Sequence, residues 1–169
     1  MNSTKKIRRI VLLGLCVSLA LILSYIEALL PPLFPSVPGI KIGLANIVTV
    51  FLLYRYGALD AAGVSLLRIV LSSLLFGNAF AFLYSVAGAV LSLAAMAFLK
   101  KTDRFSFVGV SVAGGILHNL GQTLVAVFAL GTAEIGYYMI VLSISGTVAG
   151  VIVGSCAGML LSRLERVHR

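Results

Sequence analysis

The chain has 169 residues, of which 60% are hydrophobic and 11% are charged. Ordinary soluble domains contain roughly a quarter charged residues, and a domain of this size could not bury so much apolar surface. This composition excludes a soluble enzyme, a disordered chain and a disulfide scaffold. At about 20 residues for each crossing of a bilayer, the length allows a single domain of six membrane spans.

The formal net charge is +8, but the basic residues do not form the continuous face that nucleic acid requires. Of the 13 lysines and arginines, 11 fall into four short groups separated by long apolar stretches. These groups are Lys5–Arg9, Arg55, Lys100–Arg104 and Arg163–Arg169. Basic residues at alternate ends of apolar spans mark the cytoplasmic side of a membrane protein. We therefore expect a multi-pass protein of the cell membrane, with both termini cytoplasmic and no nucleic-acid partner.

Apolar segments and the turn residues between them predict six helices. They cover approximately residues 10–30, 40–57, 58–77, 79–99, 105–130 and 137–162. The basic start and the apolar run after it also fit a signal peptide, but the run continues to Leu30 without an Ala-x-Ala cleavage site. We expect an uncleaved first helix in an all-α integral membrane bundle, with short connections that make consecutive helices antiparallel.

All four prolines lie within residues 31–38, between the first two predicted helices. Because proline cannot continue a helix, this segment predicts an ordered loop at the outer surface. Its apolar side chains fit two interpretations, a loop packed on the lipid headgroups or a lid over an outward-facing cavity. The residues of the expected gate are Pro31, Pro35 and Pro38.

Four glycines at intervals of four residues lie on one face of the sixth predicted helix. They are Gly146, Gly150, Gly154 and Gly158. A face of small residues allows two helix backbones to approach closely in a membrane. It can pack inside the bundle or against a separate membrane subunit. Gly14 and Ser18 form a weaker face of this kind on the first predicted helix.

Arg68 lies about midway along the third predicted helix, where a charged side chain is costly and marks a candidate functional group. Ser65 and Ser72, one turn on either side, extend its polar stripe. Arg68 can form an ion pair between helices, or it can bind an anionic ligand. Among the acidic residues, Glu27 has the expected membrane depth nearest to that of Arg68. The sequence therefore offers few partners for an ion pair. We expect an anionic ligand or a polar network at Arg68.

A second polar group lies at a similar depth on the fifth predicted helix, in the sequence HNLGQ. His118 and Gln122 are four residues apart and share a helix face, and Asn119 is a neighbour of Gln122. Their side chains can bind a ligand or form hydrogen bonds between helices.

Nearer the outer surface, Lys41 can face a cavity or snorkel to the interface, and Asn78 is expected to cap the fourth predicted helix. The residues expected to bind a solute are Lys41, Asn46, Arg68, Asn78, His118, Asn119 and Gln122. Together they predict a cationic cavity that suits a phosphate or a carboxylate.

The chain has five acidic residues, and no two of them lie within five positions of each other. A DDxxD-type site for magnesium and diphosphate is therefore absent. There is also no P-loop, HExxH, GxSxG or metal-ligand spacing. We expect no catalytic residues, no enzymatic activity, and no bound metal or cofactor.

Several segments resemble the Gx transporter family, which also carries the label heptaprenyl diphosphate synthase component I. They are SYIEALLPPLFP with GIKIGLANIV, LLRIVLSSLLFGNAFAFLYSVAGAVLS, and HNLGQ. The resemblance extends from Lys6 to about Ser162. More distantly, the architecture is similar to the substrate-binding S components of bacterial energy-coupling factor transporters.

This resemblance implies a six-helix protein that captures a vitamin-like or other small solute from outside. It also implies a gate in the loop between the first two helices, and partners consisting of a T-type membrane subunit and two cytosolic ATPases. S components often carry an AxxxA motif for the T subunit. This chain has no such pair at the corresponding place, and the candidate substitutes are Gly14 with Ser18 and Cys16 with Ala20. The alternative is a non-catalytic membrane subunit associated with prenyl-diphosphate or quinone synthesis, or with flavin-based extracellular electron transfer.

Overall fold

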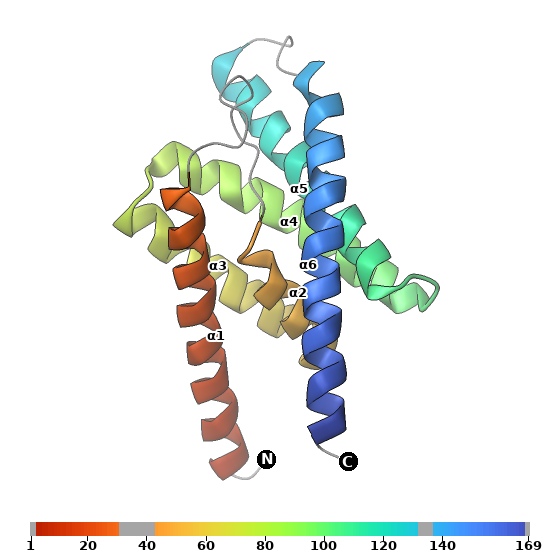
Figure 1. Cartoon of the computed structure of the whole chain (residues 1–169). Helices are drawn as coiled ribbons and strands as arrows, with labels where there is room; N and C mark the ends of the chain where they lie inside the picture. The colour runs from red at the N-terminus through yellow and green to blue at the C-terminus, as the bar shows by residue number, and fades with distance from the viewer. Residues whose placement is uncertain (1–2, 31–42, 132–136, 168–169) are drawn as a thin grey trace.

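The computed structural model describes residues 3–30, 43–131 and 137–167, which form a bundle of helices (Figure 1). The helices are α1 (Ser3–Leu29), α2 (Asn46–Arg55), α3 (Ala58–Leu75), α4 (Ala79–Thr102), α5 (Phe107–Leu130) and α6 (Met139–Val167). No β-strand occurs within these described ranges. The predicted fold class, an all-α membrane protein, is confirmed.

Three helices are longer than the sequence predicts. The first begins at Ser3 rather than near residue 10, the fourth continues to Thr102 rather than ending near residue 99, and the last continues to Val167 rather than ending near residue 162. All three extensions contain basic residues that flank the apolar spans. Lysine and arginine are good helix formers, so the helix continues beyond the part that lies in lipid.

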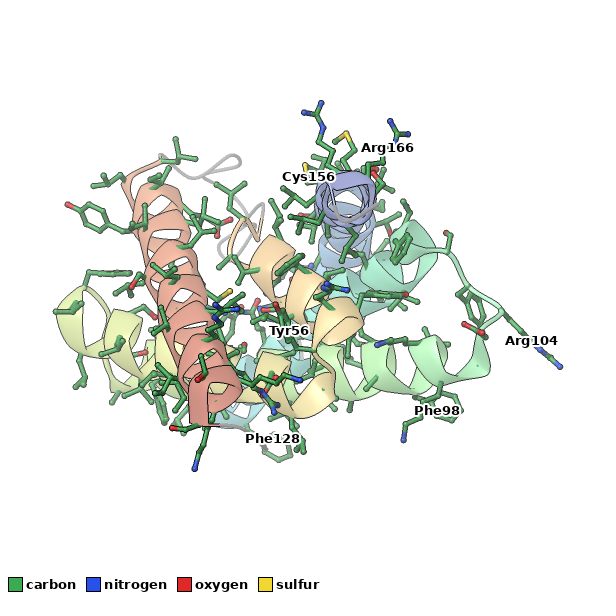
Figure 2. The ribbon with its side chains drawn as sticks, turned by 90° about the horizontal axis from the view of Figure 1, so that it is seen from below. Tyr56, Phe98, Arg104, Phe128, Cys156 and Arg166 are labelled. Atoms are coloured by element: carbon green, nitrogen blue, oxygen red, sulfur yellow. The ribbon has the colours of Figure 1, made fainter. Side chains whose placement is uncertain are left out.

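Five helices are long and apolar enough to cross a bilayer: α1, α3, α4, α5 and α6. Large apolar side chains cover their outer surfaces, and Leu59, Leu74 and Phe128 are 88%, 78% and 86% exposed. Figure 2 shows Phe98 and Phe128 on the outside of the bundle. Lipid is the environment that such a surface requires. The chain is therefore a multi-pass membrane protein.

The short helix α2 corrects the prediction of a helix over residues 40–57, because it begins at Asn46 and has 10 residues. At 1.5 Å per residue it is ~15 Å long, about half the thickness of the hydrocarbon core. The chain turns at Gly43, whose φ of 74° is one that glycine adopts readily. The amide of Gly43 donates a hydrogen bond to the carboxylate of Glu27. A sixth crossing of the membrane remains a prediction.

The core of the molecule surrounds α2, which lies between α1 and α6 in Figure 1. Val50, Leu52 and Leu53 are almost completely buried. At the end of the helix, Lys100 of α4 donates a hydrogen bond of 2.6 Å to the carbonyl oxygen of Leu53 and lies 3.5 Å from that of Tyr54. The ammonium group thus satisfies carbonyls that a helix C-terminus leaves open.

Contacts at both ends show that α1 and α3 run parallel to each other. Arg9 forms an ion pair of 2.7 Å with Asp60, which joins the first turns of α1 to the start of α3. At their other ends, Tyr25 and Phe76 pack with ring centroids 5.5 Å apart. The two chain termini lie at the same end of the molecule (Figure 1). Seen from below in Figure 2, Arg104 and Arg166 extend away from the helices.

The glycines of α6 pack inside the bundle against α5. A Cβ atom at Gly150 would lie 2.5 Å from the Cα of Val112, and one at Gly154 would lie 2.8 Å from the Cα of Val108. At Gly158 the nearest atom to the added Cβ would be a ring carbon of Phe107 at an ordinary 3.6 Å. Positions 150 and 154 therefore require glycine, whereas position 158 tolerates a side chain.

Candidate functional site

A cavity of about 310 Å³ opens between the helices and is lined by residues from all six of them. Its volume corresponds to about ten water molecules and lies at the lower end of the range for small-molecule sites. Six of the seven predicted binding residues line it. They are Asn46, Arg68, Asn78, His118, Asn119 and Gln122. The seventh, Lys41, lies outside the described residues, as do Pro31, Pro35 and Pro38 of the expected gate.

Two opposite charges, Arg68 of α3 and Glu27 of α1, line the same cavity. They attract each other electrostatically, but their nearest nitrogen and oxygen atoms are more than 4.0 Å apart. One oxygen of Glu27 accepts the hydrogen bond from Gly43. Within the described parts of the chain, the guanidinium of Arg68 has no hydrogen-bond partner. Its donors are therefore available to a molecule in the cavity.

The polar residues of α5 are positioned by their neighbours on α4 and α6. A Cβ atom at Gly88 of α4 would lie 2.9 Å from Cε1 of His118 and 3.0 Å from Cγ of Gln122. The absence of a side chain at Gly88 thus leaves space for both. Asn119 donates a hydrogen bond to the carbonyl oxygen of Leu142 in α6. It therefore both lines the cavity and holds two helices together.

Two asparagines lie where helices begin. The side chain of Asn78 caps α4, as predicted, because its Oδ1 accepts a hydrogen bond of 2.8 Å from the amide of Ala81. The side-chain nitrogen of Asn78 takes no part in this cap, and the residue also lines the cavity. Asn46 is the first residue of α2, and the short length of that helix places it at the cavity wall.

Serine hydroxyls also line the cavity, although the sequence pattern singled out only Ser72 among them. They belong to Ser24, Ser72, Ser73, Ser85, Ser92 and Ser111. Within the described residues, the buried hydroxyl of Ser24 has no hydrogen-bond partner. Ser24 lies three residues before Glu27, so helical spacing from a cavity acid could have identified it. Ser65 was expected to share the polar stripe of Arg68 with Ser72. It instead lines an apolar groove between α3 and α4.

The small residues of α1 have a different environment from the glycines of α6. A Cβ atom at Gly14 would meet no atom within 4 Å, and the hydroxyl of Ser18 donates a hydrogen bond of 3.1 Å to the carbonyl oxygen of Gly14. Both residues are exposed. This face is therefore not used for packing against the described parts of the chain.

The cavity wall carries both charged and neutral polar groups. It combines a guanidinium, a carboxylate, an imidazole, amides and hydroxyls, which recognise charge and hydrogen-bonding groups. Within the ranges that the structure describes, no three histidine, cysteine, aspartate or glutamate side chains are placed to hold a metal ion.

The sequence model of the family described as heptaprenyl diphosphate synthase component I matches residues 16–160 of the chain. The match covers most of the sequence, and the chain belongs to this family. The family is the one that the resemblance to the Gx transporter family predicts. No curated protein and no solved structure matches the chain significantly.

Proposed function

We propose that this member of the heptaprenyl diphosphate synthase component I family is the solute-capturing membrane component of a transporter of the energy-coupling factor type. The observation that carries the proposal is the cavity around Arg68, whose guanidinium has no hydrogen-bond partner among the described residues. A charged group inside a membrane protein is costly, and such groups commonly serve substrate binding. The solute is small and carries an anionic group.

Packing alone accounts poorly for the composition of the cavity wall. Helices in a membrane can pack through small and apolar residues, as α5 and α6 do through Gly150 and Gly154. Arg68, His118 and Gln122 instead line an open volume of about 310 Å³. A polar wall around a space of that size favours a bound solute over a purely structural network.

The proposed role requires partners that supply energy. We expect a T-type membrane subunit with two cytosolic ATPases, on the side where the two termini and the ion pair of Arg9 with Asp60 lie. The exposed surface of α1 around Gly14 and Ser18 offers a face on which another helix can approach closely. In this proposal the chain captures a solute and catalyses no reaction.

The family description also supports a second candidate function. A component of a prenyl-diphosphate synthase could be a non-catalytic membrane subunit that assembles with a soluble enzyme. A supporting role in quinone synthesis or in flavin-based electron transfer belongs to the same class. In these cases the polar cavity would hold a partner segment or a redox molecule rather than a transported solute.

One experiment distinguishes the two proposed functions. The protein is purified in a mild detergent, and the proteins and small molecules that remain bound to it are identified by mass spectrometry. We expect a T-type subunit, ATPases and a small polar solute. Arg68→Gln should reduce solute retention by about 10–100-fold, because hydrogen bonds to a charged group contribute about 1.5–3 kcal/mol. Arg104→Gln, which changes an exposed arginine, is the matched control. A prenyl synthase or redox subunits, with no solute that depends on Arg68, would contradict the transporter proposal.

A further inference from the structure

The cavity contains opposite charges that do not touch. Arg68 and Glu27 come from α3 and α1, and their charged atoms are more than 4.0 Å apart although both face the same space. A simple structural ion pair would bring the two groups into contact, as Arg9 and Asp60 are at 2.7 Å. Both groups instead line the cavity, so one molecule in it can contact each of them.

The two groups select opposite features of such a molecule. The guanidinium of Arg68 is a planar set of donors that matches a carboxylate or a phosphate. The carboxylate of Glu27 only accepts hydrogen bonds when ionised. One of its oxygens accepts from Gly43, and a carboxylate has further acceptor positions on both oxygens. An ammonium or a polarised N–H group satisfies those positions, whereas a second anionic group is repelled.

Hydroxyl groups accompany both charges. Ser24 lies one turn before Glu27 on α1, and Ser72 lies one turn after Arg68 on α3. The hydroxyl of Ser24 is buried and, among the described residues, lacks a hydrogen-bond partner. Ser72 donates to the carbonyl oxygen of Ile69 at 3.1 Å, so its oxygen can still accept. The space between the charges is therefore a polar site rather than a gap in apolar packing.

We propose that the solute of this cavity is amphoteric, with an oxyanion group held by Arg68 and an ammonium or N–H-rich group facing Glu27. The two groups belong to one molecule that displaces about ten waters. This inference rests on the proposed function of solute capture. It adds Glu27 as a second recognition residue, and it changes the expectation of a purely cationic cavity.

The test is equilibrium dialysis of the detergent-solubilised full chain against a small-molecule extract of the organism that encodes it, followed by mass spectrometry. The variants are Arg68→Gln and Glu27→Gln, and the exposed residues Arg104→Gln and Asp103→Asn are the matched controls. Glutamine at position 27 keeps an oxygen that can accept from Gly43, so the helix start is preserved while the charge is removed. The second control adds no strain, because Asp103 has a φ of 56° that asparagine also adopts.

The expected result is a solute that carries both an anionic and a cationic or N–H group. Its enrichment should fall at least about tenfold in Arg68→Gln and in Glu27→Gln, and stay unchanged in both controls. The inference is overturned if the enriched solute is purely anionic, or if Glu27→Gln retains it as well as or better than the unmodified chain. In that case the proposed function still stands. If the unmodified chain enriches no solute, the proposed function fails and the inference fails with it.

Discussion

The glycines of α6 allow a sharp test of the packing, because the structure separates positions that look equivalent in the sequence. Gly150 faces the backbone of α5, where an added Cβ atom would lie 2.5 Å from the Cα of Val112 and 2.8 Å from the carbonyl oxygen of Ser111. Gly158, two turns later on the same face, would place its Cβ atom 3.6 Å from the ring of Phe107. We predict that Gly150→Ala destabilises the protein and that Gly158→Ala does not.

The magnitude follows from the distances. Ordinary van der Waals contact begins near 3.4 Å, so an alanine at position 150 forces the two helix backbones apart by about 1 Å. Overpacking of this kind costs about 1–3 kcal/mol, and the higher helix propensity of alanine offsets up to about 1 kcal/mol of that. Gly158→Ala gains the higher helix propensity of alanine without a steric clash against α5. The free energy of unfolding of this variant should therefore rise by up to about 1 kcal/mol.

Thermal unfolding in detergent measures both changes. The chain has no tryptophan, so a thiol-reactive dye is the suitable probe, since Cys16 and Cys156 are free and partly buried. We expect the Tm of Gly150→Ala to fall by several degrees, at about 2–4 °C per kcal/mol for a chain of this length. Equal Tm values for Gly150→Ala and Gly158→Ala would refute the assignment of this face to internal packing.

Two further predictions concern residues that position the site. Gly88→Ala should lower stability by about 1–3 kcal/mol and reduce solute retention, since its Cβ atom would lie 2.9 Å from both Cε1 and the carbonyl oxygen of His118. Gly63→Ala, with no atom within 4 Å of the added carbon, should change neither stability nor solute retention. An equal loss of both in Gly63→Ala would contradict the steric role assigned to Gly88. Lys100→Met should lower stability by about 1–2 kcal/mol and speed hydrogen exchange at the end of α2, because it removes the donor to Leu53. Lys101→Met, on the exposed side of α4, should have little effect in the same hydrogen-exchange measurement.

The long helices were predictable because their signal is local. Apolar runs, the glycine at position 57 and the cap at Asn78 determine where α3 and α4 begin, and the structure has them there. The beginning of α2 was not predictable in this way. It depends on a turn at Gly43 whose amide binds Glu27, which is 16 residues earlier in the chain. A single contact between two distant segments produces no hydrophobic periodicity in the sequence of either segment, so a pattern search does not detect it.

The candidate site was predictable in part for a related reason. Arg68, His118 and Gln122 stand out because charged and polar groups are rare in apolar spans. Serines are common in membrane helices, where they also form hydrogen bonds to their own backbone, so Ser92 and Ser111 carry no comparable signal. Only the packing of α5 against α4 and α6 brings these two residues to the cavity wall.

The short length of α2 connects the fold to the proposed function. Ten residues cover ~15 Å, so this helix fills only about half of the depth of a bilayer. Lys100 satisfies its final carbonyls, while Glu27 binds the turn before its first residue. Because the helix begins only at Asn46, Gly43 and Asn46 line the cavity rather than a continuous helix surface. A solute bound to the remaining acceptor positions of Glu27 would hold this carboxylate in place beside Gly43, so occupation of the cavity and the start of α2 should be coupled. Hydrogen exchange at the amides of residues 43–48 should therefore slow when solute is bound, and unchanged exchange would show that the two are independent.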